Sequence, residues 1–222
     1  MAFTLGSTSI TYPNGTVQTT VPADSGKLLS VQPFYVSGTW TNPGATYVIV
    51  KCVGGGGGAA GYCESGGAGG YAEGLYNISG VATVAVTVGG GGGGVGYYAA
   101  AGAGGTSSFG SYCSATGGNG SNTSYGHSGG AGGTGSGGQV NLQGGGGSGH
   151  TNSSGANTMG RGGWSYFGGG RSQVRNHGNN SLYGPQFRGA PGSGAPGQMS
   201  DGYNTNKGTP GETGIVIVYS YK

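Results

Sequence analysis

The chain has 222 residues, of which 61 are glycine; only 6% are charged, and the net charge is +3. This charge is too small for a typical disordered protein, and so much glycine excludes an ordinary side-chain core through most of the chain. No apolar stretch is long enough to span a membrane, and the N-terminus lacks the features of a secretory leader, so we expect neither.

Residues 1–33 contain little glycine and differ from the rest of the chain. Asn14-Gly15 is a hairpin signal, because these two residues readily adopt the backbone angles of a two-residue turn. The segment is too short to form a core of its own. We therefore predict that it attaches the chain to another protein.

Strands are predicted where apolar and polar residues alternate and β-branched residues are frequent. The segments with this pattern are 34–40, 45–53, 71–78, 82–88, 106–115 and 214–222. No window has the 3.6-residue period of a helix, so essentially no α-helix is expected. The last strand must pair with strands far upstream. The sequence thus predicts a mostly β protein with a small β-sandwich over 34–116, closed by the C-terminal strand 214–222.

The glycine runs predict a second kind of structure. They include 54–58, 66–70, 89–94, 129–133, 144–147 and 168–170. A polyproline-II helix has three residues per turn and no internal hydrogen bonds, so its amides and carbonyls are free to pair with neighbouring helices. Glycine lets such backbones approach closely. We predict glycine-rich excursions at 54–70 and 89–105 and a polyglycine-II helix bundle at 117–213.

The runs are expected to leave the sandwich and return to it alternately, and a run of five residues spans roughly 15 Å. This alternation predicts distal loops at 59–65, 95–101, 121–128, 148–159 and 171–188. It makes 189–197 a returning run and 198–207 a connection at the proximal end, beside the sandwich. Trp164, Tyr166 and Phe167 also fall at the proximal end, where we expect a hydrophobic lid.

The predicted distal loops contain many aromatic and basic side chains, which suit a binding surface. Tyrosine gives contact area at low entropy cost, and arginine can hold a phosphate or carboxylate through two hydrogen bonds. The predicted binding residues are Tyr62, Tyr97, Tyr98, Tyr125, His127, His150, Arg171, Arg175, His177, Tyr183, Phe187 and Arg188. The alternative is that the arginines only keep a neutral tip soluble.

Six segments follow one another in a distinctive order from Phe34 onward: Ser37-Gly38-Thr39-Trp40-Thr41, Val48-Ile49-Val50 before a glycine block, Gly69-Gly70-Tyr71-Ala72-Glu73-Gly74, Val86-Thr87-Val88-Gly89, Gly104-Gly105-Thr106-Ser107-Ser108-Phe109-Gly110 and Gly214-Ile215-Val216-Ile217-Val218. In the order of these segments the chain resembles the glycine-rich distal proteins of bacteriophage tail fibres. Its alternating glycine-rich and variable segments are also similar to the receptor-recognising adhesins of T-even-like phages.

This resemblance implies a virion protein at the distal end of a tail fibre, whose loops bind a host outer-membrane protein or a surface glycan such as lipopolysaccharide. Residues 1–33 would then join the fibre shaft. A homo-oligomer is possible, and neither nucleic-acid binding nor membrane insertion is expected. The alternative is a structural virion or extracellular fibre protein that assembles with itself through its glycine-rich region. An ice-binding protein would need a more regular repeat.

Enzyme chemistry is not expected. Gly126-His127-Ser128-Gly129-Gly130 matches the pattern of a hydrolase nucleophile elbow, but it lacks the strand and helix that must flank one. The histidines lie far apart and the carboxylates are scattered, so we predict no catalytic residue, metal or cofactor. Cys52, Cys63 and Cys113 are expected to be free thiols or to form one bridge at most.

Overall fold

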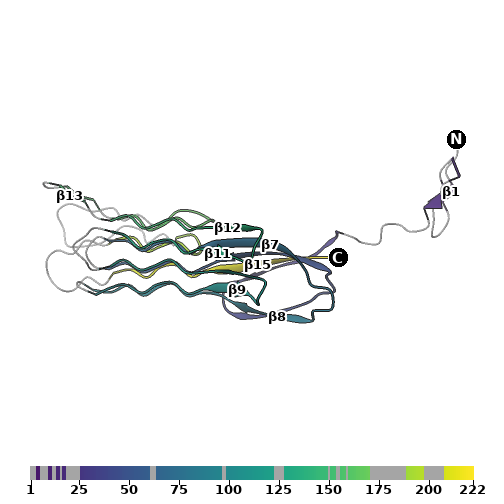
Figure 1. Ribbon diagram of the computed structural model, residues 1–222, viewed down its shortest axis with the longest axis horizontal. Coiled ribbons are helices and arrows are strands. Elements are labelled where there is room, and N and C mark those ends of the chain that lie inside the picture. The colour runs from purple at the N-terminus through teal and green to yellow at the C-terminus, as the bar shows by residue number, and fades with distance from the viewer. Residues whose placement is uncertain are drawn as a thin grey trace.

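A computed structural model describes residues 4–5, 10–11, 14–15, 17–18, 26–60, 64–96, 99–122, 128–149, 151–153, 156–158, 160–170, 189–197 and 208–222. These residues form strands and extended runs without a helix, as the sequence predicts. They accordingly contain no helix that could span a membrane. Figure 1 shows most of the strands gathered in one part of an elongated body, with long extended runs leading away from them.

The N-terminal segment contains the predicted hairpin. Three short strands, β1 (Thr4–Leu5), β2 (Ile10–Thr11) and β3 (Val17–Gln18), form an antiparallel sheet in the order β1-β2-β3. Between β2 and β3 lies the Asn14-Gly15 turn, in which Gly15 has a φ of 79°. This left-handed conformation favours glycine because a Cβ would clash there.

Two antiparallel sheets of five strands each form the sandwich. The first sheet has the order β12 (Val140–Leu142), β7 (Tyr71–Asn77), β6 (Tyr47–Val53), β15 (Ile215–Tyr221), β4 (Leu28–Phe34). The second has the order β11 (Gly135–Ser136), β10 (Cys113–Ala115), β9 (Ser107–Phe109), β8 (Thr83–Thr87), β5 (Gly38–Thr41). The C-terminal strand β15 pairs with both β6 and β4, which confirms that it closes the sandwich.

The predicted strand 34–40 is wrong, because the chain changes sheets within it. Phe34 ends β4 in the first sheet, the chain bends at residues 35–36, and Gly38 begins β5 in the second. The predicted boundary of the attachment segment at residue 33 therefore falls inside β4. Pro33 is tolerated in this strand because β4 lies at a sheet edge, where a missing N–H breaks no ladder on its open side.

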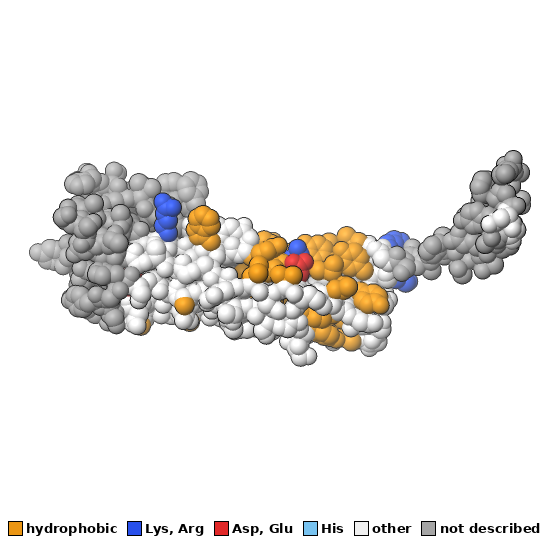
Figure 2. Space-filling model, turned by 45° about the horizontal axis from the view of Figure 1, so that its top comes forward, with side chains coloured by type: hydrophobic (Ala, Val, Ile, Leu, Met, Phe, Trp, Pro, Cys, Tyr) orange, Lys and Arg blue, Asp and Glu red, His pale blue; other side chains and the backbone are white. Residues whose placement is uncertain are grey.

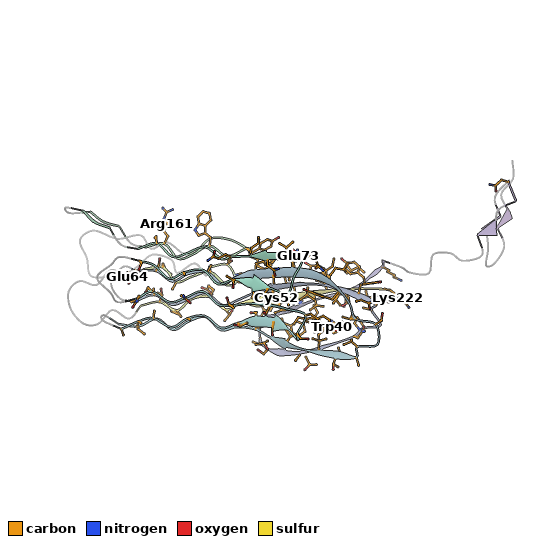
Figure 3. The ribbon with its side chains drawn as sticks, in the orientation of Figure 1. Trp40, Cys52, Glu64, Glu73, Arg161 and Lys222 are labelled. Carbon is orange, nitrogen blue, oxygen red and sulfur yellow. The ribbon has the colours of Figure 1, made fainter. Side chains whose placement is uncertain are left out.

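The core lies between the two sheets and follows the period of two. On β6 the inward residues are Val48, Val50 and Cys52, and on β15 they are Val216 and Val218. The largest side chain of this core is that of Trp40. Its ring meets the Phe109 ring edge-on, with centroids 5.6 Å apart, and Figure 3 shows it between the strands of the sandwich.

Two cysteines meet across this core. Cys52 on β6 and Cys113 on β10 are both buried and free, and their Sγ atoms lie 3.5 Å apart. The hydrogen bond between the two thiols and the burial of Cys52 raise the pKa of Cys52, which therefore remains a thiol. Both cysteines are therefore free thiols, one of the two states predicted from the sequence. Cys63 lies outside the described residues.

Candidate functional site

Beyond the sandwich the chain runs back and forth in extended segments, which together we call the glycine bundle. Its described runs are 54–60, 64–70, 89–96, 101–106, 116–122, 128–134, 143–149, 160–164, 192–197 and 208–214. Two further strands, β13 (Thr151–Ser153) and β14 (Ala156–Thr158), form a hairpin at the end away from the sandwich.

The hydrogen bonds of run 54–60 repeat every three residues. Gly54, Gly55 and Gly56 donate their N–H groups to three different runs, and Gly57, Gly58 and Ala59 donate to the same three in the same order. The acceptors are the carbonyls of Gly70, Gly105 and Glu212, then those of Gly67, Gly102 and Thr209, at 2.8–3.1 Å. A period of three is that of a polyproline-II helix, so the predicted polyglycine-II packing is confirmed.

The carbonyls of this run point to three other neighbours. They accept hydrogen bonds from runs 89–96, 116–122 and 192–197, so run 54–60 has six neighbours in all. Run 64–70 is bonded to six runs in the same way. The other runs form a closed ring around these two, each bonded to the next. The central backbones are therefore fixed from every side, which makes the bundle a rigid support.

Such packing leaves no room for a side chain at most central glycines, although the small Ala68 is fully buried in run 64–70. A Cβ on Gly57 would lie 2.0 Å from the carbonyl oxygen of Asn119. In the outer runs one residue in three faces outward, as Thr116, Asn119 and Asn122 do. Arg161 and Trp164 share an outer ridge of run 160–164 in the same manner, and Figure 3 shows Arg161 pointing away from the bundle.

The bundle brings most of the predicted loops to one end. The residues that flank 61–63, 97–98, 123–127 and 150–159 all lie at the distal end, where the outgoing runs finish and the returning runs begin. The predicted alternation is correct as far as the chain reversal at residues 165–168, which lies beside the sandwich.

The predicted direction of 189–197 is wrong. Gly192 lies against Val53 at the proximal end, and Gly197 donates its N–H to Gly160 at the distal end, so this run goes outward. The cause is a turn at Pro191-Gly192, in which Gly192 has a φ of 75°. The residues that flank 198–207 are consequently distal, not proximal: Gly208 donates to Val95.

All the predicted binding residues lie outside the described part of the chain. These are Tyr62, Tyr97, Tyr98, Tyr125, His127, His150, Arg171, Arg175, His177, Tyr183, Phe187 and Arg188. For half of them the flanking residues are distal, as expected. For 171–188 they are not, because Gly170 lies against Gly162 within the bundle and Gly189 lies beside Ser193.

Buried hydroxyl groups hold the bases of the distal loops. Ser65 Oγ lies 2.7 Å from the carbonyl oxygens of both Ser148 and Arg161 and shares its single proton between them, which joins three runs. Ser121 Oγ accepts the N–H of Ala60 at 2.7 Å. Neither serine is among the residues predicted from the sequence, although a lone serine at the end of a glycine run is a usable signal.

The hydrogen bonding with a period of three explains why glycine is so frequent from the end of β6 onward. Residues 34–221 match the glycine-rich domain family. The chain belongs to the glycine-rich domain family. No curated protein matched the chain. Within the described residues of this glycine-rich domain, no group of three or more His, Cys, Asp or Glu side chains could hold a metal ion.

Glu64 is an unusual group for the interior of a glycine-rich domain. It lies at the distal start of run 64–70, is only 5% exposed, and its Oε2 atom has no hydrogen-bond partner. Burial raises the pKa of this carboxyl above its ordinary value of 4.5, because the charged form loses its hydration.

Glu64→Gln is expected to make the protein more stable at neutral pH and to leave its stability unchanged at pH 4. Below pH 4.5 the carboxyl is neutral in both the folded and the unfolded chain; at higher pH only the unfolded chain ionises freely, so folding stability falls as the pH rises. Thermal melts from pH 4 to pH 8 measure the difference. An equal gain in stability at pH 4 and pH 8 in Glu64→Gln would contradict the explanation.

The aromatic residues at 164–167 meet only part of the prediction. Tyr166 stacks on Tyr71, with ring centroids 3.6 Å apart, and helps to bury it, so it does act as a lid. Trp164 is 64% exposed, and the lid prediction is wrong for this residue. The reason is its outward place in run 160–164.

Proposed function

We propose that this chain is the receptor-binding tip of a bacteriophage tail fibre. The observation that carries the proposal is the gathering of loop ends at the end of the glycine bundle farthest from the sandwich. A rigid support that presents several loops in one direction suits recognition of a surface, because little ordering entropy is lost on binding.

The packing of the bundle supports this separation of roles. Substitutions at central glycines are opposed by contacts such as that of Gly57 with Asn119, and Ser65 and Ser121 fix the ends of the runs from which the loops start. Loops that can change without disturbing their support are typical of binding sites. The proposed ligand is a host outer-membrane protein or a surface glycan.

The proposed location is the distal end of the fibre in the virion, with residues 1–33 directed to the fibre shaft. The strands β1–β3 lie within this segment and are bonded to one another, not to the sandwich. The sequence resemblance to phage tip proteins supports this arrangement. Neither nucleic-acid binding nor catalysis forms part of the proposal.

Binding of the fluorescently labelled protein to a panel of bacterial strains tests the proposal. The first variant is Tyr97→Ala/Tyr98→Ala, since Gly96 and Ala99 are distal, and the second is Arg171→Ala/Arg175→Ala. The matched control is Tyr35→Ala/Val36→Ala, an exposed pair beside the sandwich. We expect strain-specific binding that falls at least tenfold in a loop variant and is retained in the control.

Comparison of the loop variants shows which loop contacts the receptor. If only the arginine variant loses binding to the cells, the receptor contact lies in 171–188. If only the tyrosine variant loses binding, the contact lies in the loop after Gly96. Binding to no strain, or equal binding by all folded variants, would overturn the proposal in favour of a structural fibre protein.

A further inference from the structure

The outward face of the first sheet is apolar, and beyond the part that Tyr166 covers the described residues leave it exposed. On this face the exposed residues are Leu28, Val31, Tyr47, Leu75, Val140 and Leu142. Ile49, Ile217, Tyr219 and Tyr221 lie among them and are half-buried. We call this set the outer face. The opposite sides of the same strands already fill the core, so the sheet is apolar on both sides.

The strand register makes the outer face continuous. Leu75, Ile49, Tyr219 and Val31 are direct partners on β7, β6, β15 and β4 and form one row across four strands. The next row toward the bundle contains Val140, Glu73, Lys51 and Ile217. A contiguous apolar surface of this kind on a soluble protein marks an interaction site.

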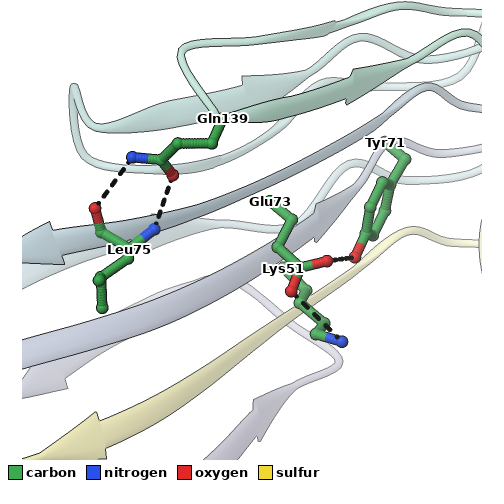
Figure 4. Close-up of polar contacts among 5 residues, drawn as sticks. All are labelled: Lys51, Tyr71, Glu73, Leu75 and Gln139. Carbon is green, nitrogen blue, oxygen red and sulfur yellow. Dashed lines mark hydrogen bonds and ion pairs between the residues drawn. The ribbon is translucent and has the colours of Figure 1, made fainter.

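One ion pair lies in the middle of the outer face. Lys51 Nζ lies 3.6 Å from Glu73 Oε1, and Tyr71 Oη donates a hydrogen bond to the other carboxylate oxygen, Oε2. Figure 4 shows this cluster beside Leu75, whose backbone is bonded to the Gln139 side chain. In Figure 2 apolar side chains lie on both sides of an acidic group and the basic group next to it.

We propose that the outer face binds the outer face of a second copy of this chain, around a two-fold axis that runs parallel to the strands between β6 and β7. Lys51 and Glu73 are direct partners on these two strands, so this axis places each Lys51 over the Glu73 of the other copy. A two-fold interface requires a self-complementary surface, and this pair supplies it.

For two sheets stacked with aligned strands, the axis can run along the strands or across them, and the ion pair favours the first direction. An axis across the strands would place Lys51 over Lys51, or over an apolar residue such as Ile49. Like charges would then meet, or the ion pair would be buried without new partners, and either arrangement is unfavourable. Sheets stacked with nearly aligned strands are a common packing, with the two backbones about 10 Å apart.

The proposed axis has a consequence for function. Because the strands of the two copies run in the same direction, both glycine bundles leave the interface on the same side. The dimer would present two distal ends side by side, and two linked sites can bind a surface far more tightly than one. This inference does not depend on what the distal ends bind.

Light scattering during size-exclusion chromatography tests the dimer. The wild-type chain is expected to have the mass of two copies, and Leu75→Asp that of one, because the new carboxylate would be buried in the interface. Leu75 is 53% exposed in the single chain, so the substitution is compatible with folding, and a thermal melt checks this. Val36→Asp, at a residue that is 75% exposed but outside the outer face, is the control and is expected to remain dimeric.

Charge exchange tests the pairing of Lys51 with Glu73. Lys51→Glu places like charges opposite each other and is expected to weaken the dimer at least tenfold, whereas Lys51→Glu/Glu73→Lys is expected to restore it. A wild-type monomer at all concentrations would overturn the proposal and leave the outer face to a different protein, such as a fibre shaft. A dimer unaffected by both Leu75→Asp and Lys51→Glu would show that the interface lies elsewhere.

Spin labels test the direction of the two copies. In a Cys63→Ser background, Ser128→Cys provides an exposed labelling site at the distal end, while Cys52 and Cys113 are buried. Parallel copies are expected to give a short distance between the two labels. Labels separated by the length of two bundles would overturn the proposed axis.

Discussion

Gly57→Ala is expected to destabilise the protein by about 3 kcal/mol or more, because the added methyl group cannot be accommodated by side-chain movement. Its Cβ would lie 2.0 Å from the carbonyl oxygen and 2.4 Å from the carbonyl carbon of Asn119, both backbone atoms. Relief of this clash would move run 116–122 away and break the hydrogen bonds that Gly118 and Ser121 donate to run 54–60.

Gly93→Ala is the matched control and is expected to stabilise the protein, whereas Gly57→Ala destabilises it. A Cβ on Gly93 would meet no atom within 4 Å, and its φ lies outside the left-handed region. Alanine restricts the unfolded chain more than glycine does, so a gain of about 0.4–1 kcal/mol is expected.

Thermal melts followed by circular dichroism measure both changes. For a chain of this length, 3 kcal/mol corresponds to a fall in Tm of roughly 6–12 °C. Equal Tm values for the two variants would contradict the six-neighbour packing, because that packing distinguishes a central glycine from an outward one.

The strands could be predicted from the sequence because their pattern is local. The alternation of Val48, Val50 and Cys52 with outward residues identifies β6, and that of Val216 and Val218 identifies β15. The period of two in β4 is interrupted by Pro33 and by a bulge at Leu29, which has no direct partner on β15. The alternation therefore does not identify β4. The change of sheet after Phe34 leaves no mark in the period.

The extended glycine runs were also predictable, but their arrangement was not. Glycine content shows that backbones approach each other; it does not show which runs are neighbours, since every central glycine has the same bonding groups. The period of three in outward side chains identifies the outer runs: Thr116, Asn119 and Asn122 follow it, and so do Arg161 and Trp164.

The error in run 189–197 has a local cause. Pro191-Gly192 is a turn signal, because proline fixes its own φ and glycine accepts a positive one. Counting glycine runs alone overlooked it, and every later direction was reversed until the last strand. A single two-residue turn can thus decide which end of the bundle a loop occupies.

Trp40→Ala is expected to lower the free energy of unfolding by about 3–5 kcal/mol. Trp164→Ala is expected to change it by less than about 0.5 kcal/mol, although both residues are tryptophans. Trp40 is fully buried between the sheets and contacts Phe109, so its removal leaves a cavity in the core. Trp164 is 64% exposed on an outer ridge.

A third variant separates packing from hydrogen bonding at Trp40. Its Nε1 atom is buried without a hydrogen-bond partner, which costs about 1–3 kcal/mol in the wild-type protein. Trp40→Phe removes this unpaired group and keeps an aromatic ring. It is therefore expected to lower the free energy of unfolding by less than half as much as Trp40→Ala. Urea unfolding followed by circular dichroism gives all three values. A loss as large for Trp40→Phe as for Trp40→Ala would mean that the indole N–H has a partner after all. The sandwich would then be held together at this point by a polar contact as well as by packing.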